Sequence, residues 1–170
     1  MKKRTRAREL ALQFLYQLDL RGEGLYPEAR EFVSAEERDV ETTRFALRLV
    51  QGTHENKASI DQMIQSVAQN WNISRMAVVD RNVLRLATYE LVHCPDVPPK
   101  VAINEAIELG KRYSTQNSGA FINGILDKIM NRQTPATPLA AAPTGNATAT
   151  PSLSTLDDEL PESASSTERD

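Results

Sequence analysis

The stretch TRARELALQFLYQLDLR (residues 5–21) carries the pattern that decides how this 170-residue sequence is interpreted. Its apolar residues recur at intervals of three and four, which is the period of one face of an α-helix. They are Ala7, Leu10, Ala11, Phe14, Leu15 and Leu18. Gly22 and Gly24 follow shortly after and predict the end of the helix. The chain is therefore predicted to begin with a helix that buries one side.

The same helical period continues to about residue 130, and no segment alternates between apolar and polar residues as a strand would. Pro27 lies in a stretch, 25–35, that we expect to be irregular, and the prolines of 95–99 must separate two helices. Ser74 is the expected N-cap of the helix before those prolines. Helices are expected over about 35–55, 60–71, 74–93, 100–113 and 121–130. Trp71 is expected to end the apolar, core-facing stripe of the second of these. The predicted fold class is all-α, with about seven helices packed as small antiparallel bundles.

Residues 133–170 differ in composition from the rest of the chain. They contain no aromatic residue, five prolines, six acidic residues and one basic residue. The whole chain has 20 basic and 23 acidic residues and a net charge of −3, so residues 1–132 hold 19 basic and 17 acidic residues, a net of +2. A segment like 133–170 has too little apolar surface to offset the entropy of ordering. We therefore expect a folded, slightly basic domain over 1–132 and a disordered tail over 133–170.

Composition also bears on where the protein works. No apolar run reaches the roughly 20 residues of a membrane span, and no signal-peptide core follows the basic start. The single cysteine, Cys94, cannot form an internal disulfide, which fits a reducing compartment. We therefore expect a soluble, cytoplasmic protein that does not contact a membrane.

Motifs for catalysis or cofactor binding are not found in the sequence. It has no glycine-rich phosphate loop, and His54, His93 and Cys94 cannot form a zinc site of the usual spacing. Since His93 and Cys94 are neighbours at a helix end, we interpret them as a structural histidine and a buried thiol. Glu105 and Glu108 share a helix face that we interpret as solvated. We expect no catalytic residue, no metal and no cofactor, and so no enzyme.

The start of the first helix is strongly basic. Cations oppose the helix dipole at an N-terminus, which favours a partner such as the phosphates of RNA or DNA. A merely solvated helix start and a targeting peptide are the alternatives, and acidic residues within the helix disfavour the second. Residues four apart in a helix are offset by only about 40° around its axis, so a series at this spacing stays on nearly the same face. That face carries Arg4, Arg8, Leu12 and Tyr16. Its two bases, Arg4 and Arg8, and its aromatic ring, Tyr16, are expected to look outward together.

Several longer stretches resemble one family of proteins. They are RARELALQFLYQLD (6–19), VLRLATYEL (83–91), DVPPKVAINEAIELGKRY (96–113) and FINGILDKI (121–129). These segments resemble the NusB family of bacterial transcription antitermination factors, over about residues 4–130. The stretch 22–72 matches only in its helical pattern, and the chain after Arg132 departs from the family, which usually ends soon after the last helix.

The resemblance implies a helical fold of two small bundles. It also implies binding to the single-stranded boxA element of ribosomal RNA leader transcripts, jointly with NusE, a ribosomal protein of the small subunit, in the antitermination complex of RNA polymerase. By position, the implied RNA-binding residues at the start of the chain are Arg4, Arg6 and Arg8, helped by Lys2 and Lys3. Tyr16, Asn117 and Phe121 complete the RNA set, and Asp80 is implied to bind NusE.

The turn STQNSG (114–119) supports a second anion-binding patch. It leads into the last helix, so that Ser118 and the neighbouring backbone amides form a helix N-terminus that favours phosphate. Lys111 and Arg112 lie just before the turn and Phe121 just after it. We expect this patch and the first helix to converge on one groove. For Phe121, a place in the apolar stripe of the last helix is an equal alternative.

Two other functions remain open from the sequence. A related helical domain begins certain RNA cytosine methyltransferases, although here only the low-complexity residues 133–170 follow the predicted domain. The second alternative is a helical protein-interaction module that does not touch RNA. The acidic tail could also fold back on the basic head and compete with RNA, although an inert extension is the simpler interpretation.

Overall fold

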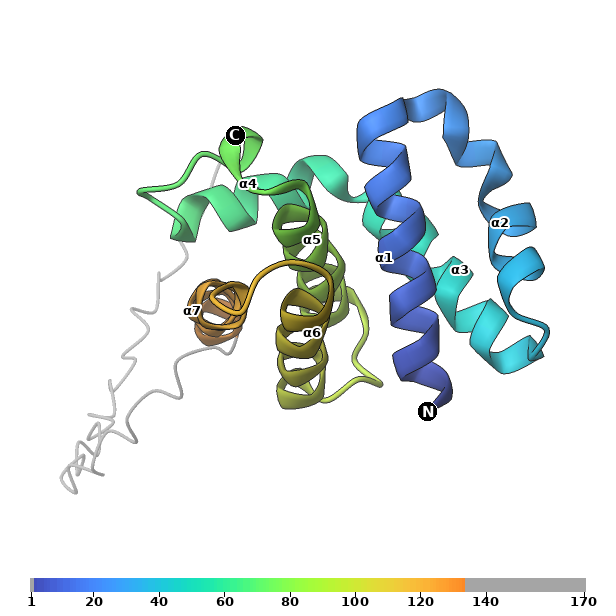
Figure 1. The fold of residues 1–170 in the computed structure, drawn as a ribbon. Helices are drawn as coiled ribbons and strands as arrows, with labels where there is room; N and C mark the ends of the chain where they lie inside the picture. The colour runs from blue at the N-terminus through green and yellow to red at the C-terminus, as the bar shows by residue number, and fades with distance from the viewer. Residues whose placement is uncertain (1, 134–170) are drawn as a thin grey trace, which may run out of the picture. The chain divides into compact units, whose positions relative to one another are not determined.

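The chain folds into helices throughout the part that the structure, a computed structural model, describes, which is residues 2–133 (Figure 1). Within this range there are seven α-helices, two short 3-10 helices and no strand. The elements are α1 (Lys3–Arg21), η1 (Glu23–Glu28), α2 (Ala29–Glu36), α3 (Val40–Glu55), α4 (Lys57–Val67), η2 (Ile73–Arg75), α5 (Val78–His93), α6 (Pro99–Tyr113) and α7 (Ser118–Gln133). The all-α prediction is confirmed. Apart from Gln133, the predicted tail lies outside the described residues.

Two groups of helices meet around α5. Helices α1, α2 and α3 pack together, with α1 against α3 as the most extensive contact, and α4, α6 and α7 form the second group. Helix α5 contacts α1 and α3 on one side and α4, α6 and α7 on the other, as Figure 1 shows. The two small bundles implied by the family resemblance therefore share one central helix.

Three local predictions differ from the structure. The stretch 25–35 is not irregular, because the 3-10 turn η1 absorbs Pro27 and leads directly into α2. The next helix starts at Val40 rather than near residue 35, since Asp39 caps it by accepting a hydrogen bond from the Thr42 N–H at 2.9 Å. Ser74 is not the N-cap of α5. It lies in η2, where its N–H and hydroxyl donate to the Asn72 side chain.

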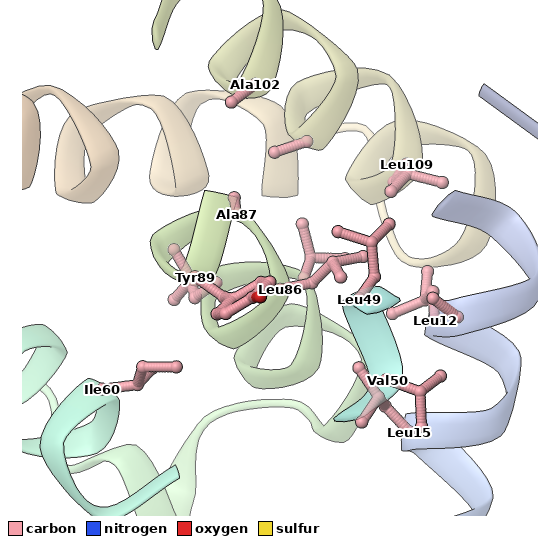
Figure 2. Close-up of a cluster of buried hydrophobic side chains, with 14 of the residues drawn as sticks. Leu12, Leu15, Leu49, Val50, Ile60, Leu86, Ala87, Tyr89, Ala102 and Leu109 are labelled. Atoms are coloured by element: carbon pink, nitrogen blue, oxygen red, sulfur yellow. The ribbon is translucent and has the colours of Figure 1, made fainter. Parts of the chain in front are cut away.

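The core is aliphatic and runs through both groups of helices. The predicted stripe of α1 is buried, and Figure 2 shows Leu12 and Leu15 of this helix facing Leu49 and Val50 of α3 beside Leu86 of α5. Cys94 at the end of α5 is buried, as predicted. No helix in the described range is long and apolar enough to cross a membrane.

A half-buried carboxylate, Asp19, fastens the end of α1 to α5. It accepts hydrogen bonds from Arg81 at 2.6 Å, from Asn82 at 2.9 Å and from Arg85 at 3.2 Å, and Arg85 in turn binds Asp61 of α4 at 2.7 Å. Burial alone would raise the pKa of Asp19, but hydrogen bonds from Arg81 and Asn82 and the charge of Arg85 outweigh it. The pKa of Asp19 therefore lies below its ordinary value.

The closest approach between α3 and α5 yields a first prediction. A Cβ atom at Gly52 of α3 would overlap the ring of Tyr89, whereas one at Gly124 on the exposed side of α7 would meet nothing. We expect Gly52→Ala to lower the free energy of unfolding by about 1–3 kcal/mol through overpacking. Gly124→Ala is the matched control and should raise it by up to about 1 kcal/mol through helix propensity. Urea unfolding of both variants measures this, and equal effects would contradict the packing argument.

The Asp19 cluster yields a prediction on acid stability. Because its pKa is lowered in the folded state, ionised Asp19 contributes stability that is fully present above the unfolded pKa of about 4 and is lost as the pH falls through the folded value. Asp19→Asn should therefore be less stable than the parent chain at pH 7, and the difference should shrink below about pH 5. Urea unfolding at several pH values tests this. A difference that is constant with pH would argue against a charge effect.

Candidate nucleic-acid interface

The cations at the start of α1 are already paired with carboxylates of the same chain. Lys3, Arg4 and Arg6 each reach at least one acidic side chain on a different helix or loop. The pairs are Lys3 with Asp39 (3.2 Å) and Glu41 (2.8 Å), Arg4 with Asp96 (3.1 Å), and Arg6 with Glu9 (3.4 Å) and Glu37 (3.9 Å). The basic start is thus neither a bare cationic arm nor merely a solvated helix start. It ties α1 to the segment before α3 and to the loop after α5.

Arg8 is buried, although the sequence predicted that it looks outward with Arg4 and Tyr16. Only 2% of its side chain is exposed, and its guanidinium lies 2.7 Å from Glu90 of α5 and 3.7 Å from Glu105 of α6. Leu12, on the same face, is buried as well. The prediction is wrong for Arg8 because α5 and α6 cover the middle of that face and leave its two ends exposed.

Arg4 is held at the exposed end of this face by two contacts. Its guanidinium lies 4.5 Å from the centre of the Phe45 ring, and it shares the carboxylate of Asp96 with Arg48 of α3. Hydrogen bonds from Arg48, and then from Arg4, hold the pKa of Asp96 well below its ordinary value. About half of the Arg4 side chain stays exposed. Arg4 is therefore positioned and still accessible.

A groove of about 580 Å³ runs between α1 and α6, and its lining contains the cations of the second predicted patch but none of those at the start of α1. Lys111 and Arg112 line it from α6, and Thr5 and Glu9 line it from α1. Arg112 forms an ion pair with Glu9 across the groove. Three carboxylates, those of Glu9, Glu105 and Glu108, lie in the same lining, so the groove is mixed in charge.

The first turn of α7 lies beside the end of α6. The Ser118 hydroxyl is buried and bonds inward, accepting from the Thr115 N–H at 3.3 Å and donating to Ser114 at 3.1 Å. It closes the turn and does not point to solvent, so a ligand here would meet backbone amides and the exposed side chains of Thr115, Gln116 and Asn117. The Lys111 stem lies over Gly119, since a Cβ there would come within 3.0 Å of Lys111 Cε.

The two predicted aromatic residues lie in different grooves. Tyr16 shares a groove of about 530 Å³ with Tyr113 of α6, and Phe121 lies against Trp71, with ring centres 5.5 Å apart. Phe121 is half-buried and packs against the core. It therefore belongs partly to the apolar stripe of the last helix and is partly accessible to a ligand, which combines the two expected roles. The sequence interpretation missed Tyr113 and placed Trp71 in the core stripe of the preceding helix. That placement is wrong, because α4 ends at Val67 and Trp71 is 57% exposed.

Asp80 lies in the first turn of α5, where a carboxylate is favoured by the helix dipole. Its side chain is half-buried, and Oδ1 has no hydrogen-bond partner within the described part of the chain. A buried oxygen without a donor is costly, so this carboxylate is not stabilised by the fold around it. His, Cys, Asp and Glu side chains do not cluster as metal ligands anywhere in residues 2–133.

Comparison with known proteins identifies the family to which this arrangement belongs. The model of the NusB family matches residues 5–131, which is most of the described fold. The chain belongs to the NusB family. Transcription antitermination protein NusB of Anaeromyxobacter dehalogenans (strain 2CP-1 / ATCC BAA-258) is 50% identical over 135 residues, which make up 79% of this chain and 94% of that protein.

Solved NusB structures share the fold. A structure of T. maritima NusB matches with a TM-score of 0.72 and 43% identity, covering 78% of this chain and 93% of that one. A crystal structure of the antitermination factors NusB and NusE in complex with dsRNA matches with a TM-score of 0.70 and 30% identity, covering 78% and 98%. The family resemblance noted in the sequence is therefore confirmed over the whole helical part.

The buried Arg8 yields a prediction that differs from the sequence-based one. Arg8→Ala leaves Glu90 buried without its partner, and we expect it to lower the free energy of unfolding by about 3–5 kcal/mol. The double variant Arg8→Met, Glu90→Met removes both charges and should recover most of this loss. Urea unfolding of the single and double variants measures the coupling. If Arg8→Ala unfolds like the parent chain and only binds RNA more weakly, Arg8 is an RNA ligand after all.

Proposed function

We propose that the chain is a transcription antitermination factor that binds single-stranded boxA RNA of ribosomal RNA leader transcripts jointly with NusE. It would act in the cytoplasm, within the antitermination complex of RNA polymerase, and without catalysis. The names of its curated relatives and the NusB–NusE complex with RNA among the similar structures support this role. The observation that carries it is the row of accessible, loosely paired cations at the start of α1 beside a groove that holds two more.

The cations that we assign to RNA are Lys2, Lys3, Arg4 and Arg6. Lys2 is exposed, and Lys3 and Arg4 are about half exposed in their ion pairs. Exposed ion pairs contribute only about 0–1 kcal/mol, so an RNA phosphate can replace a carboxylate at little cost. Arg8 has a different part in this proposal. It positions the cationic start of α1 through Glu90 and does not touch RNA.

The second half of the RNA surface is formed by the end of α6 and the start of α7. Lys111 and Arg112 contribute charge, and the exposed Asn117 contributes a neutral polar side chain where a carboxylate would repel phosphate. The Ser118 N–H donates to the Thr115 carbonyl at 3.1 Å and its hydroxyl is bonded within the turn, so Ser118 shapes the start of α7, and the amides that follow it are the ones we assign to phosphate. Tyr16 and Phe121 are the aromatic residues available for stacking, and Tyr113 joins Tyr16.

NusE is assigned to a separate part of the surface that includes Asp80. Its place in the first turn of α5, where the residue is only half-buried, supports this assignment, because part of the residue remains accessible to a protein partner. The division of the chain into a domain over 1–132 and a tail over 133–170 belongs to the same proposal. The methyltransferase alternative is not favoured, since the match fills 94% of the A. dehalogenans relative and leaves no room there for a cofactor domain.

Titration of labelled boxA RNA with the full chain, with and without NusE, tests this function. We expect NusE to increase the affinity, and the triple variant Lys2→Gln, Lys3→Gln, Arg4→Gln to weaken binding. The dependence of log K on log salt concentration should become shallower by about 0.7 for each phosphate that the variant no longer neutralises. An affinity that does not respond to NusE at any salt concentration would overturn the proposal.

A matched variant controls for net charge. Arg30, Arg38 and Arg44 are exposed arginines of the α2–α3 region, and changing all three to Gln removes the same charge from another surface. This control should leave the salt dependence close to that of the parent chain. Asp80→Asn forms the second arm of the experiment: it should reduce the gain from NusE and leave the binding of RNA alone unchanged.

A further inference from the structure

Trp71 is a large aromatic side chain held in solvent. It lies between α4 and η2, is 57% exposed, and is surrounded in sequence by Gln69, Asn70 and Asn72. The loop around it is fixed by Gln65 of α4, whose amide donates to the Trp71 carbonyl at 2.8 Å and accepts from the Ile73 N–H at 3.0 Å. The Trp71 N–H bonds back to the Ala68 carbonyl at 3.0 Å. The indole ring is therefore presented on a braced loop.

A second aromatic ring fixes the orientation of the indole. Phe121 of α7 packs against Trp71 with ring centres 5.5 Å apart and an interplanar angle of 70°, an edge-on arrangement. The two rings line a groove of about 580 Å³ together with Lys128, Asn131 and Arg132 of α7. This volume lies within the roughly 300–1,000 Å³ that small-ligand sites have.

The lining of the Trp71 groove differs in charge from that of the α1–α6 groove. It contains two cations and no carboxylate, whereas the α1–α6 groove contains three carboxylates. Arg132 donates to Ser66 at 2.8 Å and so stays near the groove, and Lys128 is exposed. The side-chain amides of Gln69, Asn70 and Asn131 add donors and acceptors at the rim. The site therefore combines an accessible ring, positive charge and amide groups.

We propose that the Trp71 groove binds an unpaired nucleotide of RNA, with its base stacked on Trp71. Base–aromatic stacking contributes substantially to single-strand binding, and unstacked bases laid on aromatic rings are how proteins recognise single-stranded RNA. Lys128 and Arg132 face the adjacent phosphates, and the amides of the rim meet the edge of the base. This inference rests on the proposed function, because it adds a base site to the same RNA surface.

The Trp71 groove continues the proposed RNA path. Lys111, which lines the α1–α6 groove, lies over Gly119 in the first turn of α7, and Phe121 follows in that turn. A strand that leaves the start of α1 can therefore pass along the end of α6 and around the start of α7 to Trp71. A protein partner fits this site less well, since the single exposed ring is flanked by polar side chains and does not form a broad apolar patch.

The chain's single tryptophan makes the test direct, because its fluorescence reports Trp71 alone. Single-stranded boxA RNA is titrated into the full chain at low salt, and binding is followed in parallel by anisotropy of labelled RNA. We expect quenching of the tryptophan fluorescence that saturates together with the anisotropy. Trp71→Ala should weaken binding by about 5- to 100-fold, the effect of one stacked base, and Trp71→Phe should retain most of the affinity.

Two further arms separate this inference from the proposed function. Lys128→Gln should reduce the salt dependence, and Arg30→Gln on α2, with the same change in charge, should not. If RNA binds while Trp71 fluorescence and the affinity of Trp71→Ala stay unchanged, the stacking site is overturned and the proposed function stands. If Trp71→Ala weakens the interaction with NusE and not with RNA, the groove is a protein contact and the inference is likewise overturned. Absence of RNA binding by the parent chain, both alone and with NusE, overturns both.

Discussion

The ion pair between Arg8 and Glu90 is the constraint around which the surface of the first bundle is arranged. Two charges that are each about 2% exposed must be paired, because an isolated buried charge costs several kcal/mol. The pair therefore fixes how α1 is rotated against α5, and Glu105 brings α6 to the same point at 3.7 Å. With α1 held in this rotation, Arg4 and Tyr16 emerge at its two exposed ends.

The cationic start of α1 is balanced by acidic residues within the same fold. Lys3, Arg4 and Arg6 have carboxylate partners at 2.8–3.9 Å, so in the proposed RNA complex a phosphate would compete with a carboxylate at each of them. Exposed ion pairs are weak, so breaking one costs little free energy. Each broken pair still subtracts from the binding free energy of a non-specific polyanion. Affinity then depends on several exchanges at once together with base contacts, and this favours a defined RNA over nucleic acid in general.

Helical periodicity was enough to predict most of this fold, because long buried stripes such as that of α1 leave a clear pattern. The short α2 was missed since Pro27 marks a loop in sequence, and only packing on α1 and α3 stabilises an eight-residue helix there. The predictions that Arg8 is exposed and that Trp71 is buried were wrong for a related reason. Residue type alone predicts that a cation is exposed and an indole is buried. Arg8 is buried because Glu90 pairs with it, and Trp71 is exposed because it lies beyond the end of α4.

The two grooves beside α6 and α7 suggest a division between charge and stacking. The α1–α6 groove mixes two cations with three carboxylates, so what it binds must be sensitive to salt and to the exchange of ion pairs. The Trp71 groove has no carboxylate and offers a ring, whose stacking energy depends little on ionic strength. Lys111 joins the two through its contact over Gly119. An RNA that spans both would exchange with the ion pairs of the first groove and be retained by the second, and its affinity at high salt would be set mainly by the base that stacks.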